Sequence, residues 1–162
     1  MPTTTDRYPL EKKKVVKKTI SAIFLYLVLF LVIFVPAHVF LWKIYSMILI
    51  IADVIFAAAV IAQPFYQYYY YKKYFYNVRV DFLVIQKGVL MVRETILNYD
   101  KIQDVYMDQD LLDRIFGLWD VHVSTATSMS GIEAHIDGIN HDNGMKIREL
   151  ILSKIRSGKP AK

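Results

Sequence analysis

Two long apolar runs dominate the first half of the chain. Residues 19–35 carry no charged side chain, and residues 44–62 carry only Asp53. At about 1.5 Å of rise per helical residue, each run approaches the ~30 Å of a bilayer's hydrocarbon core, and residues 37–42 can lengthen the first. The pattern predicts two transmembrane helices, at about 19–42 and 44–64, which form an antiparallel hairpin that ends near Pro64.

A cleaved signal peptide is the alternative for the first run, because lysines precede it. The run is long for a signal peptide, however, and no small-residue cleavage site follows it. A second apolar run begins at once. The transmembrane helix is therefore favoured.

The period changes from helical to strand-like after these runs. Residues 77–86 alternate apolar and polar side chains, and the turn at 86–88 leads into 89–97, which predicts a hairpin. Residues 120–126 and 132–137 predict a second hairpin around a turn at 127–131.

Two helices accompany these strands. Residues 110–117 predict a short helix with Asp108 or Asp110 as N-cap and Gly117 as its stop. Asp142 can cap a final helix from Asn143 to about Arg156, with a buried stripe on one face. The second half is therefore expected to be a small sheet domain closed by a C-terminal helix.

An aromatic cluster marks the boundary between the two halves. Nine of the twelve residues from Phe65 to Tyr76 are Phe or Tyr. Such rings favour the membrane–water interface, and lysines there extend toward phosphates. A stacking platform for carbohydrate or nucleic acid is the less favoured alternative. The predicted interfacial residues are Tyr68, Tyr69, Tyr70, Tyr71, Lys72, Lys73 and, near the other end of the hairpin, Trp42.

Charge is distributed unevenly along the chain. Residues 1–18 hold six basic and two acidic side chains, whereas 72–162 are nearly balanced, so a broad basic surface for nucleic acid is not expected. Attraction to anionic lipid headgroups is possible. Lysines flank both outer ends of the hairpin, which predicts a multi-pass plasma-membrane protein with both termini in the cytoplasm. The absence of cysteine excludes disulfides and thiol chemistry.

Three segments of the second half resemble a known family. GVL at 88–90, LNYDKIQDV at 97–105 and LLDRIFGLWDVHVSTA at 111–126 resemble the bacterial pleckstrin-homology-like domain of the membrane-flanked, YdbS-like type. The resemblance implies a curved β-sandwich or barrel with a capping C-terminal helix, preceded by two membrane helices. It implies a scaffold and no particular reaction. The expected parts are a tail at 1–18, membrane helices within 19–71, a cytoplasmic domain at 72–157 and a tail at 158–162.

Several residues of this domain are candidates for structural or binding roles. Gln103 and Arg114 lie on two motif segments and are expected to pair, with Gly117 permitting the exit from the short helix. The first hairpin turn offers only Lys87 to an anion, whereas inositol phosphates need several cationic donors. Phosphoinositide recognition is therefore not expected.

The second hairpin contains a possible metal site. If Val121 faces Ile136, then His122 lies opposite His135 and Asp120 opposite Asp137. Imidazoles and carboxylates so placed could hold a divalent cation, and a histidine pair could respond to pH. A plain polar face is the favoured interpretation.

Asp53 is unusual because it lies within an apolar helix, where a charge costs at least ~2.5–3.5 kcal/mol. In the predicted hairpin Tyr26 lies at the same depth and could hydrogen-bond to it. Packing against another subunit, or a role in proton or cation transport, are the alternatives.

The sequence contains no motif that indicates catalysis or a cofactor. We expect a non-enzymatic membrane protein whose cytoplasmic domain binds a protein partner or assembles into a homo-oligomer. Two alternatives stay open: a small oligomeric transport or channel-like protein that uses Asp53, and a domain that senses anionic lipid.

Overall fold

A computed structural model describes residues 3–125 and 134–157. The predicted turn at 127–131, the start of the strand that follows it and the tail at 158–162 lie outside the described residues. The chain divides into two compact units, a helical unit of Val15–Tyr69 and a sheet unit of residues 1–14 and 70–162.

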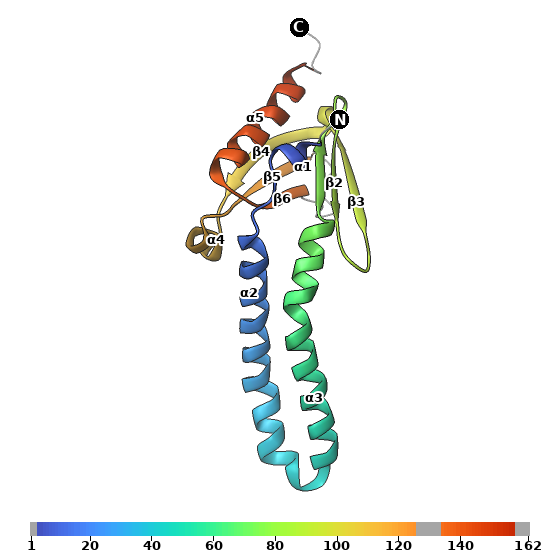
Figure 1. The fold of residues 1–162 in the computed structure, drawn as a ribbon, viewed down its shortest axis with the longest axis vertical. Helices are drawn as coiled ribbons and strands as arrows, with labels where there is room; N and C mark the ends of the chain where they lie inside the picture. The colour runs from blue at the N-terminus through green and yellow to red at the C-terminus, as the bar shows by residue number, and fades with distance from the viewer. Residues whose placement is uncertain (1–2, 126–133, 158–162) are drawn as a thin grey trace. The chain divides into compact units, whose positions relative to one another are not determined.

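The helical unit is a series of helical segments that follow one another in sequence without a gap. It consists of α2 (Lys13–Leu29), a π-helical turn η1 (Phe30–Phe34) and α3 (Val35–Lys73) (Figure 1). The first two residues of α2 and the last four of α3 belong to the sheet unit. This run is the one helix long and apolar enough to cross a membrane among the described residues. The prediction of two separate helices at 19–42 and 44–64 therefore differs from the structure, in which α2, η1 and α3 follow one another without a gap.

The chain nevertheless reverses direction inside this run. Tyr45 has non-helical backbone angles, φ −124° and ψ 29°. The ring of Phe56, which follows Tyr45 in the chain, contacts two rings that precede Tyr45. The centroid distances are 5.7 Å to Tyr26 and 4.7 Å to Phe34. Residues so distant in sequence could not meet along a straight helix, so the segments before and after Tyr45 pack against each other.

Pro64 does not end α3, which continues for nine further residues to Lys73. A proline inside a helix removes one backbone donor and crowds the preceding turn. Unwinding the helix in an apolar environment would instead leave many more backbone groups without partners. The helix therefore continues through most of the aromatic cluster, which the sequence pattern alone placed beyond the helix end. Only the last three rings, Tyr74, Phe75 and Tyr76, follow the helix.

The sheet unit contains two antiparallel sheets of three strands each. Sheet A has the order β1 (Phe75–Val78), β2 (Phe82–Lys87) and β3 (Arg93–Asn98). Sheet B has the order β4 (Ile102–Asp108), β5 (Trp119–Thr125) and β6 (Ala134–Ile139), and the 3-10 turn η2 (Tyr99–Lys101) leads from β3 into β4. Two small sheets and a C-terminal helix agree with the pleckstrin-homology-like fold that the resemblance implies.

The first predicted hairpin differs in detail from the observed strands. Residues 77–86 do not form one strand, because the chain turns after β1 and Arg79 donates its backbone N–H to the Phe82 carbonyl at 3.0 Å. The second turn is also longer than predicted, since β3 begins at Arg93 and residues 88–92 are outside any strand. Apolar alternation was present on both sides of each turn, so it could not locate them.

Two helices complete the sheet unit. α4 (Leu111–Phe116) is capped by Asp110 and ends at Gly117, whose φ of 67° is left-handed. α5 (His141–Ser157) begins two residues earlier than predicted, because Asn140 rather than Asp142 caps it, accepting from the Asn143 N–H at 2.8 Å. α5 packs on β4 and β5 and buries Ile147 and Ile151.

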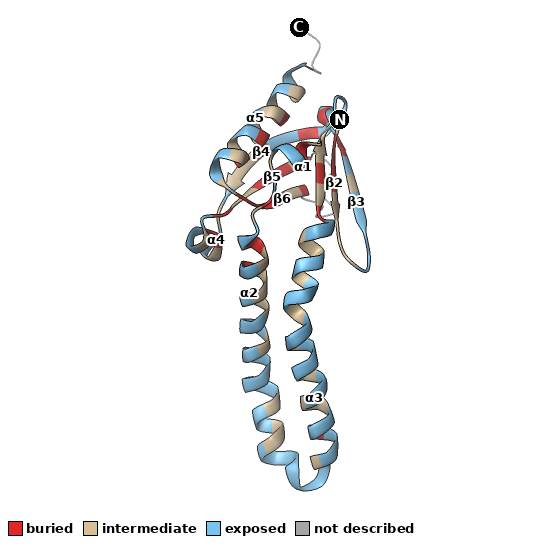
Figure 2. Cartoon of the chain, viewed as in Figure 1, coloured by how far each residue is buried: buried red, intermediate tan, exposed pale blue. Residues whose placement is uncertain are grey.

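The core lies between the sheets and α5 (Figure 2). Fully buried apolar side chains come from both sheets and from the C-terminal helix; they include Tyr76, Leu83, Val121, Val123, Ile136 and Ile147. This core is continuous across the sheet unit, so the two sheets form one domain.

The N-terminal segment is part of this domain rather than a free tail. α1 (Thr4–Arg7) lies beside β1, where Thr5 Oγ1 accepts from the Tyr76 N–H at 2.8 Å and Thr4 Oγ1 accepts from the Val78 N–H at 3.0 Å. Leu10 is buried in the core. The expected tail at 1–18 thus contributes to the sheet unit as far as Lys14, because its threonines satisfy the outer edge of β1.

Tyr99 gives the domain a defined sensitivity to alkali. Burial, assisted by the nearby Asp81 carboxylate, raises the pKa of Tyr99 to about 12, and its hydroxyl donates to the Arg79 carbonyl at 2.7 Å. In the unfolded chain the pKa of this phenol is near 10.0, so the unfolded chain loses the proton at a lower pH than the folded domain does. We expect the free energy of unfolding in detergent to fall as pH rises from about 10 to about 12.

In Tyr99→Phe this fall should be smaller over the same pH window, as measured by denaturant titrations followed by circular dichroism. Tyr68→Phe is the control, because Tyr68 is exposed and should leave the pH dependence unchanged. An identical pH dependence in wild type and Tyr99→Phe would contradict the assignment.

Candidate functional site

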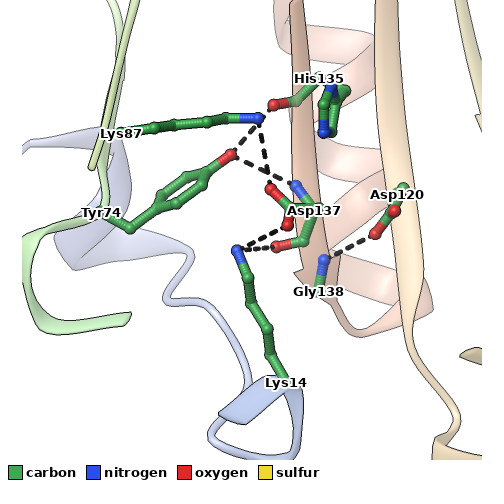
Figure 3. A network of polar contacts seen from close by, with 7 residues as sticks. All are labelled: Lys14, Tyr74, Lys87, Asp120, His135, Asp137 and Gly138. Atoms are coloured by element: carbon green, nitrogen blue, oxygen red, sulfur yellow. Dashed lines mark hydrogen bonds and ion pairs between the residues drawn. The ribbon is translucent and has the colours of Figure 1, made fainter. Parts of the chain in front are cut away.

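A buried ion cluster centred on Asp137 is the most conspicuous polar feature of the sheet unit (Figure 3). Lys14 Nζ lies 3.0 Å from Asp137 Oδ2 and also donates to the Asp137 carbonyl at 2.9 Å. Lys87 Nζ lies 3.4 Å from Asp137 Oδ1. Lys14 is only 2% exposed. Two cations from distant parts of the sequence therefore share one buried carboxylate.

Tyr74 contacts both Asp137 and Lys14 of this cluster. Its hydroxyl donates to the His135 carbonyl at 3.0 Å and accepts from the Asp137 N–H at 3.4 Å, and its ring centroid lies 3.8 Å from Lys14 Nζ. Burial, and then the charge of Asp137, hold the pKa of Tyr74 well above its ordinary value. The phenol therefore stays protonated, and it acts as a fixed donor rather than as an acid–base group.

The backbone at Gly138 makes room for Lys14. Gly138 has a φ of +79°, and a Cβ built there would lie 2.6 Å from Lys14 Cδ. Its N–H donates to Asp120 Oδ1 at 2.7 Å, and its carbonyl accepts from the Glu11 N–H at 2.8 Å. A glycine is required there by both conformation and space, so the chain around residues 11–14 can lie directly against β6.

The predicted histidine pair forms, but the predicted carboxylate pair does not. Val121 pairs with Ile136 and His122 with His135, and the two imidazole centroids are 5.5 Å apart. The register shifts between Trp119 and Val121, so Trp119 pairs with Ile139. Asp120 therefore accepts from Gly138, while Asp137 is buried with the lysines.

His122 belongs to a stacked group on sheet B. Its ring lies 4.9 Å from the Tyr106 ring, and its Nε2 lies 3.0 Å from Asp108 Oδ1. Within residues 3–125 and 134–157 no group of three or more His, Asp or Glu side chains could hold a metal ion. The metal site considered for His122, His135, Asp120 and Asp137 is therefore not assembled there.

Gln103 and Arg114 are both exposed. Among the described residues no hydrogen bond joins them, so their expected pairing is not observed. Gly117 places the Leu118 N–H 2.8 Å from the Asp113 carbonyl, which closes the end of α4. The motif therefore positions α4 through its caps rather than through Gln103 and Arg114.

The aromatic cluster is divided between the two units. Tyr68 and Tyr69 belong to the helical unit and are exposed, with ring centroids 6.1 Å apart. Tyr70 and Tyr71 pack against the core of the sheet unit, and the Tyr71 hydroxyl donates to the Leu10 carbonyl at 3.0 Å. Lys72 and Lys73 are exposed at the end of α3. The interfacial role of these residues stays a prediction.

Asp53 has a different partner from the one expected. His38 Nε2 lies 3.0 Å from Asp53 Oδ2, and His38 Nδ1 contacts the Phe34 carbonyl at 2.8 Å. Tyr26 instead packs edge-on against Phe56. Trp42 stacks on His38, with centroids 5.5 Å apart. The helical unit thus contains a His38–Asp53 pair across the chain reversal, in place of the expected contact between Asp53 and Tyr26.

No sequence pattern indicated that Lys14, Lys87 and Asp137 would form a cluster. Lys14 is one of several lysines in a basic stretch, and Asp137 lies in an ordinary alternating strand. Only the spatial contact of Lys14 and Lys87 with Asp137 distinguishes these residues from other lysines and aspartates of the chain.

The architecture described above agrees with a comparison against known families. A family profile described as the bacterial PH (pleckstrin-homology) domain matches residues 13–155. The chain belongs to the bacterial PH domain family. The predicted family is therefore confirmed, whereas the narrower YdbS-like type stays a prediction. No curated protein and no solved structure matches the chain.

The match begins within the helical run and ends in α5, so the bacterial PH domain here includes Lys14, Lys87 and Asp137. Their buried groups are engaged with one another and leave no nucleophile or free acid. The cluster joins α2, β2 and β6, and removing one partner of such a buried ion pair leaves an uncompensated charge.

Removing the shared carboxylate should destabilise the domain strongly. In Asp137→Ala the buried Lys14 ammonium loses its counter-charge, and we expect a loss of about 3–5 kcal/mol in the free energy of unfolding. The double variant Lys14→Met with Asp137→Leu removes both buried charges and should lose much less. Denaturant titration in detergent measures both.

Glu94→Ala is the matched control, because it removes an exposed carboxylate from β3 and should change stability little. Equal losses in Asp137→Ala and Glu94→Ala would show that the cluster does not stabilise the fold.

Proposed function

We propose that this bacterial PH domain protein is a non-enzymatic, membrane-tethered module that binds a protein partner or assembles with further copies of itself. Family membership and one candidate membrane helix support a membrane-associated PH-like protein. Domains of this kind are typically binding modules, and the buried Asp137 cluster offers no reactive group.

The observation that carries the proposal is a difference between the two edges of sheet A. The outer edge of β1 is covered by Thr4 and Thr5, whose hydroxyls accept from its backbone N–H groups. β3 pairs with β2 alone among the described residues, and Ile96 on it is exposed. An open strand edge is a template for an added strand from another chain.

We further propose that the helical run crosses the bilayer twice. The chain reversal at Tyr45 and the ring contacts of Phe56 support two arms. Their apolar side chains are exposed along the run, as lipid contact requires. Lysines flank both ends of the run, so both termini and the sheet unit would be cytoplasmic.

The chain contains no cysteine, so a single introduced thiol can report on the β3 edge. We expect Ile96→Cys to give a specific crosslinked adduct in native membranes, either a disulfide-linked dimer or one product with a bifunctional reagent. Val80→Cys is the matched control, because Val80 is an exposed apolar residue in the turn between β1 and β2. Immunoblotting and mass spectrometry identify the adduct.

Equal crosslinking from positions 80 and 96 would indicate random collision, and no adduct from position 96 would remove the edge as the binding surface. Either result would overturn the proposal.

Transport is a second candidate, because Asp53 and His38 form a polar pair inside the helical unit. Under the assembly proposal we expect Asp53→Asn to keep the crosslink from position 96, and we expect no proton flux from the wild-type chain in proteoliposomes. His38→Gln is the companion variant, since it removes the other ionisable group of the pair. Proton flux in the wild type that both variants abolish would favour transport instead.

A further inference from the structure

The turn between β2 and β3 presents apolar side chains to its surroundings. Leu90 is 91% exposed and Met91 is 90% exposed, and the neighbouring Val92 is also exposed. Residues 88–92 contain no polar side chain at all. Isolated exposed apolar residues are common, but a run of consecutive ones at the tip of a hairpin indicates an interaction surface.

The backbone holds this turn in a defined conformation. Gly88 has a φ of +117°, and a Cβ there would lie 1.9 Å from the Met91 carbonyl oxygen. The chain therefore folds tightly over Gly88, which directs the side chains of residues 90 and 91 outward. The conformation of the turn therefore keeps the side chains of Leu90 and Met91 exposed.

A hydrogen bond ties this turn to the end of the long helix. Lys73 Nζ donates to the Val89 carbonyl at 3.5 Å, and Lys73 is the last residue of α3. The apolar tip thus lies beside the residues that directly follow the tyrosines at 68–71.

α4 carries a second apolar tip. Leu111 is 76% exposed and Ile115 is 68% exposed, and they are four residues apart, so they share one helical face. The opposite face is fixed by the buried Asp113, which completes the capping box with Asp110. Figure 1 shows α4 and the β2–β3 turn at the same end of the sheet unit.

We propose that these two tips insert into the membrane interface and dock the bacterial PH domain on the bilayer at two points. The occupant is lipid rather than protein because the surface is continuous with the end of the candidate membrane helix through Lys73 and Val89. The contact is apolar, since Lys87 at the base of the turn is engaged with Asp137. This docking is distinct from binding at the β3 edge and does not depend on it.

The test uses the full chain in nanodiscs of neutral phosphatidylcholine, with an environment-sensitive fluorophore on a single introduced cysteine. Met91→Cys and Ile115→Cys report on the two tips. Val80→Cys is the matched control, since Val80 is 74% exposed and lies at the opposite end of β2, about 20 Å away by strand length. All three sites are exposed, so labelling should leave the core intact, which circular dichroism checks.

We expect the labels at 91 and 115 to be quenched by lipids with a nitroxide on the acyl chain and to be protected from aqueous iodide, several-fold relative to position 80. The pattern should persist at high salt, because apolar insertion is not screened. Adding Leu90→Glu should remove the protection at 91, whereas Leu90→Ile should keep it.

Four results would overturn the proposal. Iodide access at 91 equal to that at 80 would show that the turn stays in water. Protection that appears only with anionic lipid and disappears with salt would indicate headgroup attraction without insertion. Protection found in native membranes but not in nanodiscs would identify the surface as a protein interface. Quenching at 91 without quenching at 115 would overturn the two-point docking.

Discussion

The buried carboxylate of Asp137 imposes the strongest constraint on this domain. A charge so far from water is tolerated only beside an opposite charge, and here Lys14 and Lys87 both supply one. To reach it, the segment before α2 must lie against β6, which only a glycine at 138 permits. The N-terminal threonines can then cover the edge of β1, and that leaves β3 as the edge of sheet A with a single neighbour among the described strands.

Sequence patterns predicted the parts of the fold that depend on local chemistry. The His122–His135 register follows from apolar alternation, and α4 follows from its caps at Asp110 and Gly117. The position of Asp137 in the buried cluster could not be predicted. A register shift near Trp119 prevents Asp137 from pairing with Asp120, and no residue type marks that shift. Lys14 was equally hidden among similar lysines, and Pro64 suggested a helix end that the apolar surroundings override.

The helical unit and the sheet unit satisfy their polar groups by different means. In the sheet unit, strand pairing, caps and the Asp137 cluster do so. In the helical unit most side chains are apolar and many of them are exposed, and the His38–Asp53 pair is a polar contact between its two arms. The imidazole of His38 gives Asp53 a hydrogen-bonding partner in this apolar stretch, which a lone carboxyl group there would lack. The π-helical turn η1 directly precedes this pair, and such turns often accompany functional positions.

The discontinuous sheet unit also determines the order of events during synthesis. Lys14 and Asp137 are 123 residues apart, and the whole helical unit lies between them. At typical bacterial and eukaryotic elongation rates the ribosome needs on the order of ten seconds to span that interval. The whole helical unit is therefore synthesised before β6 exists. The buried pair of Lys14 and Asp137 can form only after that, so closure of the sheet unit is a late event.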